Sequence, residues 1–419
     1  MARLIYCLAL YLGAPLVWLR LLWRSRRQPE YLQHLGERWG FYRQRTDKPC
    51  IWVHAVSVGE TRAAQPLVEA LLAAWPGHTL LLTGMTPTGR DAGRQVYGDR
   101  VLQAYLPYDY PGAVGRFFRH FRPRFGILME TEVWPNLLAS ALSHRVPVAL
   151  ANARLSERSY RGYERFRGLA GPAFASLTAV AAQTEADAAR LRALGTPAVE
   201  VCGNLKFDVT PPQDKIDLGR QWRTEIGNRP VWLAASTREG EEPLVLAALS
   251  RLAGTNALLV LVPRHPQRFE EVSGLVGQAG YPMVRRSQGL PTADTRVWLG
   301  DSMGEMAAYY ALADIAFIGG SLLPLGGQNL IEAAACGCPV LIGPHTFNFT
   351  QATEDAIASG AARRVADGSD LGDKVRDLLG NPADLDGMRA AASAFAATHR
   401  GATAKTVALI SRLTGPAGR

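Results

Sequence analysis

The chain contains 419 residues, with 46 Lys and Arg against 37 Asp and Glu, and therefore carries a formal net charge of +9. At roughly 100 to 200 residues per domain, this length predicts two or three domains that each bury a core. Hydrophobic residues make up 47% and charged residues 20%, which excludes a disordered, fibrous or multi-span membrane protein. The 5 cysteines form no C-x-x-C pair, so the sequence indicates neither a disulfide framework nor a zinc site, and it favours a reducing compartment.

An apolar segment lies at the N-terminus. Residues 4–19 read LIYCLALYLGAPLVWL and carry no charge. As one helix they would extend about 24 Å, which is shorter than a hydrocarbon core of roughly 30 Å. Three interpretations compete: a marginal single span, an interfacial helix lying in the membrane plane, and a cleaved signal peptide. The signal peptide is the least favoured, because the basic stretch RLLWRSRRQPE follows where a small-residue cleavage site would be expected.

Positive charge is distributed asymmetrically around this apolar segment. Arg3 and the amino terminus precede it, whereas four arginines follow it, at positions 20, 24, 26 and 27. This asymmetry predicts a single N-terminal membrane anchor, residues 1–28, with the body on the cytoplasmic side. Aromatic residues mixed with the basic ones up to residue 48 suit a segment resting on anionic headgroups, the alternative being an ordinary solvated basic linker. No nucleic-acid partner is expected, since no zinc-finger spacing or RNP-like motif accompanies the charge.

Apolar runs bounded by turn residues recur along the body, each followed by a stretch of helical character. They lie at 51–56, 79–83, 101–106, 125–130, 147–152, 178–183 and 199–203, and again at 231–236, 257–263, 296–300, 314–320 and 339–343. Continuous apolar strands separated by helices predict parallel sheets covered on both faces. The polar, proline-bearing stretch 208–230 is predicted to be a linker. We therefore expect an α/β chain with two doubly wound, Rossmann-like domains facing a cleft, at residues 29–207 and 231–419.

Candidate chemical groups of the first domain follow its apolar runs. Open parallel sheets bind ligands beyond the carboxyl ends of their strands, so residues at these positions are the candidates for ligand binding and catalysis. Glu60 lies at a helix start, where its carboxylate could act as a general base or could simply favour the helix dipole. Glu130 and Glu132 end the fourth run, where neighbouring carboxylates can have their pKa values pushed apart or can cap the next helix. Lys206 ends the last run, where it would meet an anionic group, although a surface lysine is the commoner interpretation.

Anion-binding features gather in the second domain. Arg264 follows a strand, and its planar donor fork suits a phosphate. The motif GDSMGEM places backbone amides around Gly304 at a helix start. In the segment 318–344, glycines precede a helix whose N-terminus would bind phosphate, and Glu332 near its start would accept hydrogen bonds from ribose hydroxyls. The P-loop and G-x-G-x-x-G motifs are both absent. A nucleotide donor held by the second domain, across from carboxylates of the first, is typical of a GT-B glycosyltransferase.

The motifs along the body resemble those of a known family. HAVSVGE, TPTGR, LPYD, METEVWPN, NARLS, GNLKFD, STREGEE, VPRHPQRF, GDSMGEM, GGSLLPLGGQN and GPHTFNF occur in this order. Together with the N-terminal apolar segment, this set resembles the Kdo transferase family (3-deoxy-D-manno-octulosonic acid transferases). The resemblance implies a GT-B enzyme on the cytoplasmic face of the inner membrane of a Gram-negative bacterium. It would transfer Kdo from CMP-Kdo to the lipid A precursor in lipopolysaccharide synthesis.

The resemblance also implies roles for particular residues. Glu60 would be the general base that takes the proton of the acceptor hydroxyl in a single inverting displacement, while Glu130 and Lys206 match positions that stabilise the transition state. The nucleotide would be held by Pro263, Arg264, Met303, Gly304, Glu305, Asn329, Leu330, Ile331 and Glu332. No metal or other cofactor is expected, because arginine and helix-terminal amides can neutralise the leaving phosphate and no D-x-D motif occurs. In this fold the C-terminal helix often returns to the first domain, so residues near 395–415 are expected to pack there.

Three departures from the family pattern concern the donor site. Arg238 and Gln328 each stand where histidine is usual, and Leu330 with Ile331 replaces a Pro-Leu pair. Three rival functions remain: another membrane-associated GT-B transferase that uses a UDP-sugar, a sugar-nucleotide epimerase, and a catalytically silent scaffold. The epimerase would have no use for a membrane anchor, and the presence of both Glu60 and Arg264 argues against the scaffold.

Overall fold

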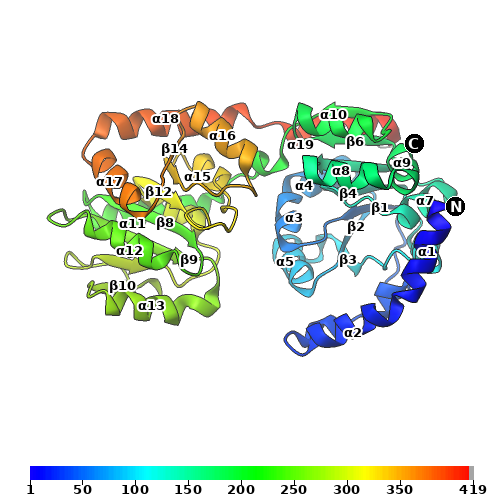
Figure 1. Cartoon of the computed structure of the whole chain (residues 1–419), viewed down its shortest axis with the longest axis horizontal. Coiled ribbons are helices and arrows are strands. Elements are labelled where there is room, and N and C mark those ends of the chain that lie inside the picture. Colours follow the sequence, from blue (N-terminus) through cyan, green and yellow to red (C-terminus); the bar gives the residue numbers. More distant parts are fainter. Residues whose placement is uncertain (415–419) are drawn as a thin grey trace. The chain divides into compact units, whose positions relative to one another are not determined.

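The computed structural model describes residues 1–414 and divides the chain into two compact units (Figure 1). The first unit contains Met1–Val209 together with the segment from Arg400 onward, and the second contains Thr210–His399. Each unit is built around its own parallel sheet with helices on both faces. The predicted α/β class, with two doubly wound domains, is therefore confirmed.

Seven parallel strands form the sheet of the first unit, in the order β3-β2-β1-β4-β5-β6-β7. Their bounds are β1 Cys50–His54, β2 Thr79–Gly84, β3 Leu102–Tyr105, β4 Phe125–Met129, β5 Val148–Ala153, β6 Ala179–Ala182 and β7 Val199–Val201. The helices between them are α3 Val58–Ala63, α4 Gln65–Ala74, α5 Pro87–Tyr97, α6 Pro111–Phe121, α7 Pro135–Ser143, α8 Glu157–Arg165, α9 Arg167–Ala175 and α10 Glu185–Ala193. Because the strand order reverses between β1 and β4, the ligand-binding crevice of this sheet is expected beyond the ends of those two strands.

Burial on both faces explains why the strands are continuously apolar. Within β1, the Trp52 side chain enters one hydrophobic cluster, whereas Ile51 and Val53 enter the cluster on the opposite face. Successive side chains of a strand point to opposite faces, so a strand covered twice needs apolar residues at every position. The same reasoning accounts for the apolar runs of the remaining central strands.

Gly126 in β4 gives one test of this packing. A Cβ atom placed at Gly126 would lie 2.4 Å from Cε3 of Trp52, whose indole is buried and donates to the Thr83 hydroxyl. The Gly126→Ala variant should therefore lose about 1 to 3 kcal/mol of unfolding free energy through overpacking. Urea unfolding measures this change. Gly162→Ala, at an exposed helical position with no atom within 4 Å, is the matched control and should be neutral or stabilising.

The second unit repeats the architecture, with the strand order β10-β11-β9-β8-β12-β13-β14. Its strands are β8 Val231–Thr237, β9 Leu258–Pro263, β10 Met283–Arg285, β11 Val297–Leu299, β12 Ile315–Ile318, β13 Val340–Ile342 and β14 Ala362–Arg364. Its helices are α11 Gln213–Ile226, α12 Glu242–Ser250, α13 Phe269–Gln278, α14 Met306–Leu312, α15 Ile331–Ala335, α16 Thr350–Ala358, α17 Gly368–Leu379 and α18 Pro382–Thr398. Here the strand order reverses between β8 and β12.

The predicted domain boundaries need two corrections. The stretch 208–230, predicted to be a linker, contains helix α11, which packs through Trp222 on the rings of Trp298 and Tyr309 in the second unit. The range 231–419 also extends too far, because α19, Ala402–Thr414, belongs to the first unit. That helix packs on α4 and β6, as the C-terminal return predicts. The carboxylate of Asp208 fixes its start by accepting hydrogen bonds from two main-chain amides of residues 401 and 403.

The N-terminal apolar segment forms two helices, α1 Ala2–Leu12 and α2 Ala14–Ser25, which are bent by 48° at Gly13. Within the described residues, neither helix alone has the length and apolar character needed to cross a bilayer, whereas the bent pair meets both criteria when taken together. One face of α1 is bound to the first unit, where the Tyr6 hydroxyl donates to Asp109 at 3.0 Å. The Tyr110 hydroxyl likewise donates to the Leu10 carbonyl. Large apolar side chains of the pair are exposed, namely Leu4, Ile5, Leu8, Leu12, Leu16, Leu19, Leu22 and Trp23.

Candidate active site

Glu60 is fixed at the turn between β1 and α3 by a reciprocal capping arrangement. Ser57 is the N-cap of α3, and its hydroxyl oxygen accepts from the Glu60 amide at 3.4 Å. The Glu60 carboxylate reaches back and accepts from the Val56 amide at 2.8 Å and from the Ser57 hydroxyl at 3.1 Å. This arrangement is a variant of the capping box, with the Val56 amide in place of the N-cap amide, so the glutamate does contribute to the helix start. The same bonds hold its carboxylate beyond the end of β1, where a ligand of the sheet would lie.

The environment of Glu60 also changes its acidity. The pKa of Glu60 is raised to about 7, mainly by burial and also by the negative charges of Glu130 and Glu132, while the hydrogen bonds from Val56 and Ser57 act in the opposite direction. A carboxylate with a pKa near 7 is half-ionised at neutral pH and can take a proton from a reacting hydroxyl. The two roles that the sequence left open for Glu60, helix capping and proton acceptance, are therefore compatible in one side chain.

The end of β4 brings two more carboxylates to this edge. Glu130 has a φ of 55°, in the left-handed region, and its amide donates to the Ala151 carbonyl in β5. Glu132 accepts from the indole of Trp134 at 2.9 Å, while burial, followed by the charge of Glu130, raises the pKa of Glu132. A strand end in the left-handed region is unusual for glutamate, and the turn directs the chain into α7.

The alternative role suggested for Glu130 and Glu132 was to cap the next helix, α7, but neither glutamate does so. Asp109 does so instead: its carboxylate accepts from the amides of Asn136 and Leu137 at 3.0 and 2.7 Å. Asp109 also receives the Tyr6 hydroxyl from α1, and burial raises the pKa of Asp109 to about 6. Sequence reasoning did not single out this residue, although the motif LPYD contains it. Glu130 and Glu132 are thus free of the capping role.

Lys206 lies in the short 3-10 helix Leu205–Asp208, and its Nζ atom is 3.8 Å from Oε1 of Glu130. Asn152 at the end of β5 positions this segment, because its side-chain oxygen accepts from the Leu205 amide at 3.0 Å. Asn152 is buried and has a φ of 55°, a backbone region that asparagine tolerates better than most residues. The structure therefore brings Lys206 close to Glu130, through an asparagine that sequence reasoning missed.

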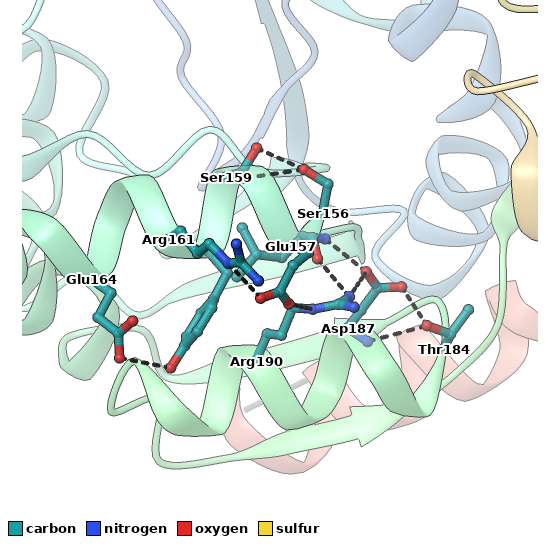
Figure 2. A network of polar contacts seen from close by, with 10 residues as sticks. Ser156, Glu157, Ser159, Arg161, Glu164, Thr184, Asp187 and Arg190 are labelled. Carbon is teal, nitrogen blue, oxygen red and sulfur yellow. Dashed lines mark hydrogen bonds and ion pairs between the residues drawn. The ribbon is translucent and has the colours of Figure 1, made fainter.

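A polar network fixes the chain just after Asn152, where the motif NARLS leads into α8 (Figure 2). The Asp187 carboxylate on α10 accepts from the Leu155 amide at 2.8 Å and from the Thr184 hydroxyl at 2.6 Å. Arg190, one turn later, donates to the Leu155 carbonyl and to the Glu157 carboxylate, as Figure 2 shows for the ion pair. This network connects the end of β5 to the helix that follows β6, and so supports the strand edge that carries Asn152.

In the second unit, the predicted nucleotide-binding residues follow three strands of one sheet. Pro263 ends β9 and Arg264 follows it, with the Arg264 amide donating to the Thr237 carbonyl at the end of β8. Met303, Gly304 and Glu305 form the turn between β11 and α14. The remaining residues, Asn329, Leu330, Ile331 and Glu332, lie after β12 at the start of α15. All of them belong to the carboxyl edge of the sheet, as predicted.

Side-chain burial limits what some of these residues can contact. Leu330 and Ile331 have relative exposures of 0% and 1%, so only their main chains are available to a nucleotide. Asn329 accepts from the Ile331 amide and donates to Oε1 of Glu332 at 3.0 Å, which holds that carboxylate at the start of α15. Glu305 accepts from the Ser302 hydroxyl and from Arg286. Arg286 follows β10, a strand that the sequence did not predict.

The carboxylate of Glu241 accepts hydrogen bonds from main-chain amides of the glycine-rich loop after β12. This carboxylate, fully buried, accepts from the main-chain amides of Gly320, Ser321 and Leu322, and from that of Arg238. The amides of residues 319, 327 and 328 are bound to main-chain carbonyls. The glycines therefore shape a turn in which these amides already have acceptors, and at the start of α15 the Ile331 amide is bound to the Asn329 side chain. Within residues 1–414 no group of three His, Cys, Asp or Glu side chains is arranged to hold a metal ion.

Comparison with known proteins agrees with this arrangement. A family model described as 3-deoxy-D-manno-octulosonic-acid transferase (kdotransferase) matches residues 33–209. A 3-deoxy-D-manno-octulosonic acid transferase of Bordetella pertussis is 47% identical over 97% of this chain and 98% of its own length. The transferase of Haemophilus influenzae is 39% identical over 84% of each chain.

Among solved structures, a glycosyltransferase from Rickettsia africae covers 88% of this chain and 99% of its own at 14% identity, with a TM-score of 0.60. The UDP-GlcNAc 2-epimerase of Neisseria meningitidis, bound to UDP-GlcNAc, covers 87% of this chain and 100% of its own, also at 14% identity with a TM-score of 0.60.

The two doubly wound units, with carboxylates at the strand ends of one and anion-binding groups at the strand ends of the other, define a glycosyltransferase of the GT-B class. The epimerase shares this fold, and its low identity shows nothing beyond the fold. The chain belongs to the 3-deoxy-D-manno-octulosonic acid transferase family, and it transfers Kdo in lipopolysaccharide biosynthesis. Family membership therefore favours Kdo transfer over the UDP-sugar, epimerase and scaffold alternatives.

Proposed function

We propose that the enzyme transfers Kdo from CMP-Kdo to a lipid A precursor, lipid IVA, in a single inverting displacement that needs no metal. The observation that carries this proposal is the Glu60 carboxylate, which is held by Val56 and Ser57 beyond the end of β1 and has a pKa of about 7. The family assignment supports Kdo as the transferred sugar, and a general base at the strand end can activate a hydroxyl acceptor.

In this mechanism Glu60 takes the proton of the acceptor hydroxyl as its oxygen attacks the anomeric carbon of Kdo. The bond from that carbon to the phosphate oxygen breaks at the same time, and CMP leaves with the bonding electrons on the side opposite the attack. One displacement inverts the anomeric configuration. Positive charge develops at the anomeric carbon, and the carboxylate of Glu130, paired with Lys206 at 3.8 Å, would stabilise it.

The donor nucleotide would be held by the second unit. Arg264 offers its guanidinium to the phosphate, whose negative charge grows as CMP departs. Glu332 accepts one bond from Asn329 through Oε1, which leaves its second oxygen for a ribose hydroxyl. Met303 and Gly304 lie in the turn after β11, where Gly304 has a φ of 79° and a Cβ atom placed on it would meet no atom within 4 Å.

We also propose that α1 and α2 attach the enzyme to the cytoplasmic face of the inner membrane by lying in its interface. Each helix is short, with 11 and 12 residues, or about 17 Å at 1.5 Å per residue. Tyr6 and Leu10 bind α1 to the body, while its other face exposes leucines next to the arginines of α2. An apolar face flanked by arginine suits anionic headgroups.

Vesicle sedimentation tests this attachment. Purified enzyme should sediment with vesicles of phosphatidylethanolamine and phosphatidylglycerol, and the double variant Leu8→Asp with Leu12→Asp should remain largely in the supernatant. Val201→Asp, on the exposed edge strand β7, is the control and should still sediment. Equal sedimentation of all three proteins would contradict the assignment of the interface to α1 and α2.

The reaction itself is tested by mass spectrometry of the lipid product. Enzyme incubated with CMP-Kdo and tetraacylated lipid A precursor should increase the lipid mass by one or more Kdo units, and a parallel reaction with a UDP-sugar should give no product. A lipid that gains mass only from the UDP-sugar would overturn the assigned donor, while leaving the fold assignment intact.

The pH dependence of kcat should follow the ionisation of Glu60. Because burial raises the pKa of Glu60 to about 7, the base is protonated below that pH and cannot accept the acceptor proton. The rate should therefore rise about tenfold per pH unit on the acid side and level off above about pH 7. Removing the Glu130 charge by Glu130→Gln should lower the pKa of Glu60 and shift the midpoint to lower pH, since that charge raises it. A midpoint near 4.5 in the wild type would contradict the assigned base.

A further inference from the structure

Two arginines follow neighbouring strands at the carboxyl edge of the second sheet. Arg238 follows β8 directly, and Arg264 follows β9, the strand that pairs with β8 on one side. The main chains are joined there, because the Arg264 amide donates to the Thr237 carbonyl at 3.0 Å. On its other side β8 pairs with β12, and the strand order reverses between these two strands. Arg238 therefore lies at the point of the sheet where ligands of such folds bind.

The guanidinium groups of Arg238 and Arg264 have no hydrogen-bonding or ionic partner within the described part of the chain. This distinguishes them from Arg268, which lies near the same edge and pairs with Glu242 at 2.6 Å and Glu271 at 2.8 Å. Both Arg238 and Arg264 are half-buried rather than fully solvated. Two partly buried guanidinium groups without a protein partner, each a planar fork of donors at a ligand edge, indicate a site for anions.

Two buried carboxylates that follow Arg238 in the chain already have partners. Glu241 receives the Arg238 main-chain amide together with amides of the loop after β12, and Glu242 is bound to Thr237 and Arg268. These arginines also act on the neighbouring histidine. Burial lowers the pKa of His265, and the positive charges of Arg238, Arg264 and Arg268 lower it as well.

Local packing directs the Arg238 stem across the end of β12. Gly320 has a φ of 71°, and a Cβ atom placed there would lie 3.6 Å from Cγ of Arg238 and 3.2 Å from the side-chain nitrogen of Gln328. The absence of a side chain at Gly320 thus makes room for the stem of Arg238 beside the Gln328 amide. The arginine is held along the loop after β12, and its charged end remains at the sheet edge.

The donor of the proposed reaction carries two anions on one carbon. In a nucleotide-activated ulosonic acid, the anomeric carbon bears both the carboxylate and the phosphate ester, whereas a common UDP-sugar has no carboxylate there. Two unpaired guanidinium groups from adjacent strand ends match this pair of charges. Resting on the proposed function, we propose that Arg264 binds the phosphate and that Arg238 binds the sugar carboxylate, which makes Arg238 a specificity-determining residue for ulosonic acid donors.

The two arginines should then have different kinetic effects. The sugar carboxylate carries one negative charge both before and during the reaction, so the Arg238 contact is equally strong in the ground state and the transition state. An interaction of that kind lowers KM without raising kcat. The phosphate gains charge as its ester bond breaks, so the Arg264 contact strengthens in the transition state and contributes to kcat.

Steady-state kinetics and CMP binding together test the assignment. Arg238→Gln should raise the KM for CMP-Kdo by about tenfold or more, as expected for loss of a charge-assisted hydrogen bond, with kcat within about threefold of wild type. Its dissociation constant for CMP, which has no sugar carboxylate, should stay within about twofold when measured by calorimetry. Arg238→Lys should give an intermediate KM, because it keeps the charge but not the planar fork.

Two comparison variants sharpen the result. Arg264→Gln should weaken CMP binding and lower kcat, whereas Arg220→Gln, an exposed residue of α11 paired with Asp217, should resemble the wild type. Equal weakening of CMP and CMP-Kdo by Arg238→Gln would place Arg238 on the nucleotide and overturn the proposal, and so would a KM unchanged in both Arg238 variants. A wild-type enzyme that accepts no CMP-Kdo would instead overturn the proposed function, before any variant is compared.

Discussion

Replacing Glu60 with glutamine should abolish Kdo transfer while leaving CMP affinity near the wild-type value. The amide of Glu60→Gln keeps an oxygen that can accept from Val56, but it cannot take a proton from the acceptor hydroxyl. Loss of a general base costs on the order of 100- to 10,000-fold in rate, and a glutamine offers no substitute at this position. CMP binding is assigned to residues of the second unit, so calorimetry with CMP should detect little change.

Glu132→Gln is the matched control for this experiment. Glu132 is another partly buried carboxylate of the same sheet edge, and burial raises its pKa as well, but its oxygen is bound to the Trp134 indole. We expect Glu132→Gln to retain most of the rate. A Glu60→Gln enzyme that transfers Kdo within tenfold of the wild-type rate would exclude Glu60 as the base.

The same substitution should show itself in the pH dependence of stability. The pKa of Glu60 in the folded protein, about 7, lies above its ordinary value of 4.5, so the folded state binds this proton more tightly than the unfolded state does. The wild type therefore loses stability as the pH rises from about 4.5 to 7 and keeps that deficit above 7. Glu60→Gln should unfold at a higher temperature than the wild type at pH 8, with a smaller difference at pH 5.

Strand positions could be predicted wherever both faces of a strand are covered. The run 231–236 was recognisable because β8 is buried at nearly every position. The strands β10 and β14 were missed, because three-residue edge strands with partly exposed side chains leave no apolar run. The sequence of helix α11 predicts a linker because its surface is polar apart from the residues, such as Trp222, that pack inside the second unit.

The candidate catalytic residues were recognisable for a related reason. Glu130 follows β4 directly, and Glu60 and Lys206 lie in the short helices that follow β1 and β7, so the topology alone places all three at one edge. The residues that position these side chains could not be recognised from the sequence, because their partners are distant in the chain. Asn152, for example, accepts from the amide of Leu205, 53 positions away. Such contacts depend on which strands are neighbours, which the order of the runs along the chain does not reveal.

Among substitutions in the second unit, we expect Glu241→Ala to cause the largest loss of unfolding free energy. The buried Glu241 carboxylate accepts four main-chain amides, three of them from the loop after β12, 79 to 81 positions away. In Glu241→Ala these amides stay buried without an acceptor, and each unsatisfied group costs about 1 to 3 kcal/mol. Part of that cost is relieved if the loop opens to water. We therefore expect a net loss of roughly 3 to 5 kcal/mol of unfolding free energy.

This loop leads to Asn329 and Glu332 and packs on the stem of Arg238, so its displacement should also weaken the donor site. Thermal unfolding and CMP calorimetry of Glu241→Ala should both show a loss. Glu239→Ala is the matched control, because Glu239 is exposed in the same turn and its removal should change the unfolding free energy by less than about 0.5 kcal/mol. If Glu241→Ala unfolds at the wild-type temperature and binds CMP normally, then the loop after β12 keeps its shape without this carboxylate, and the nucleotide site does not depend on it.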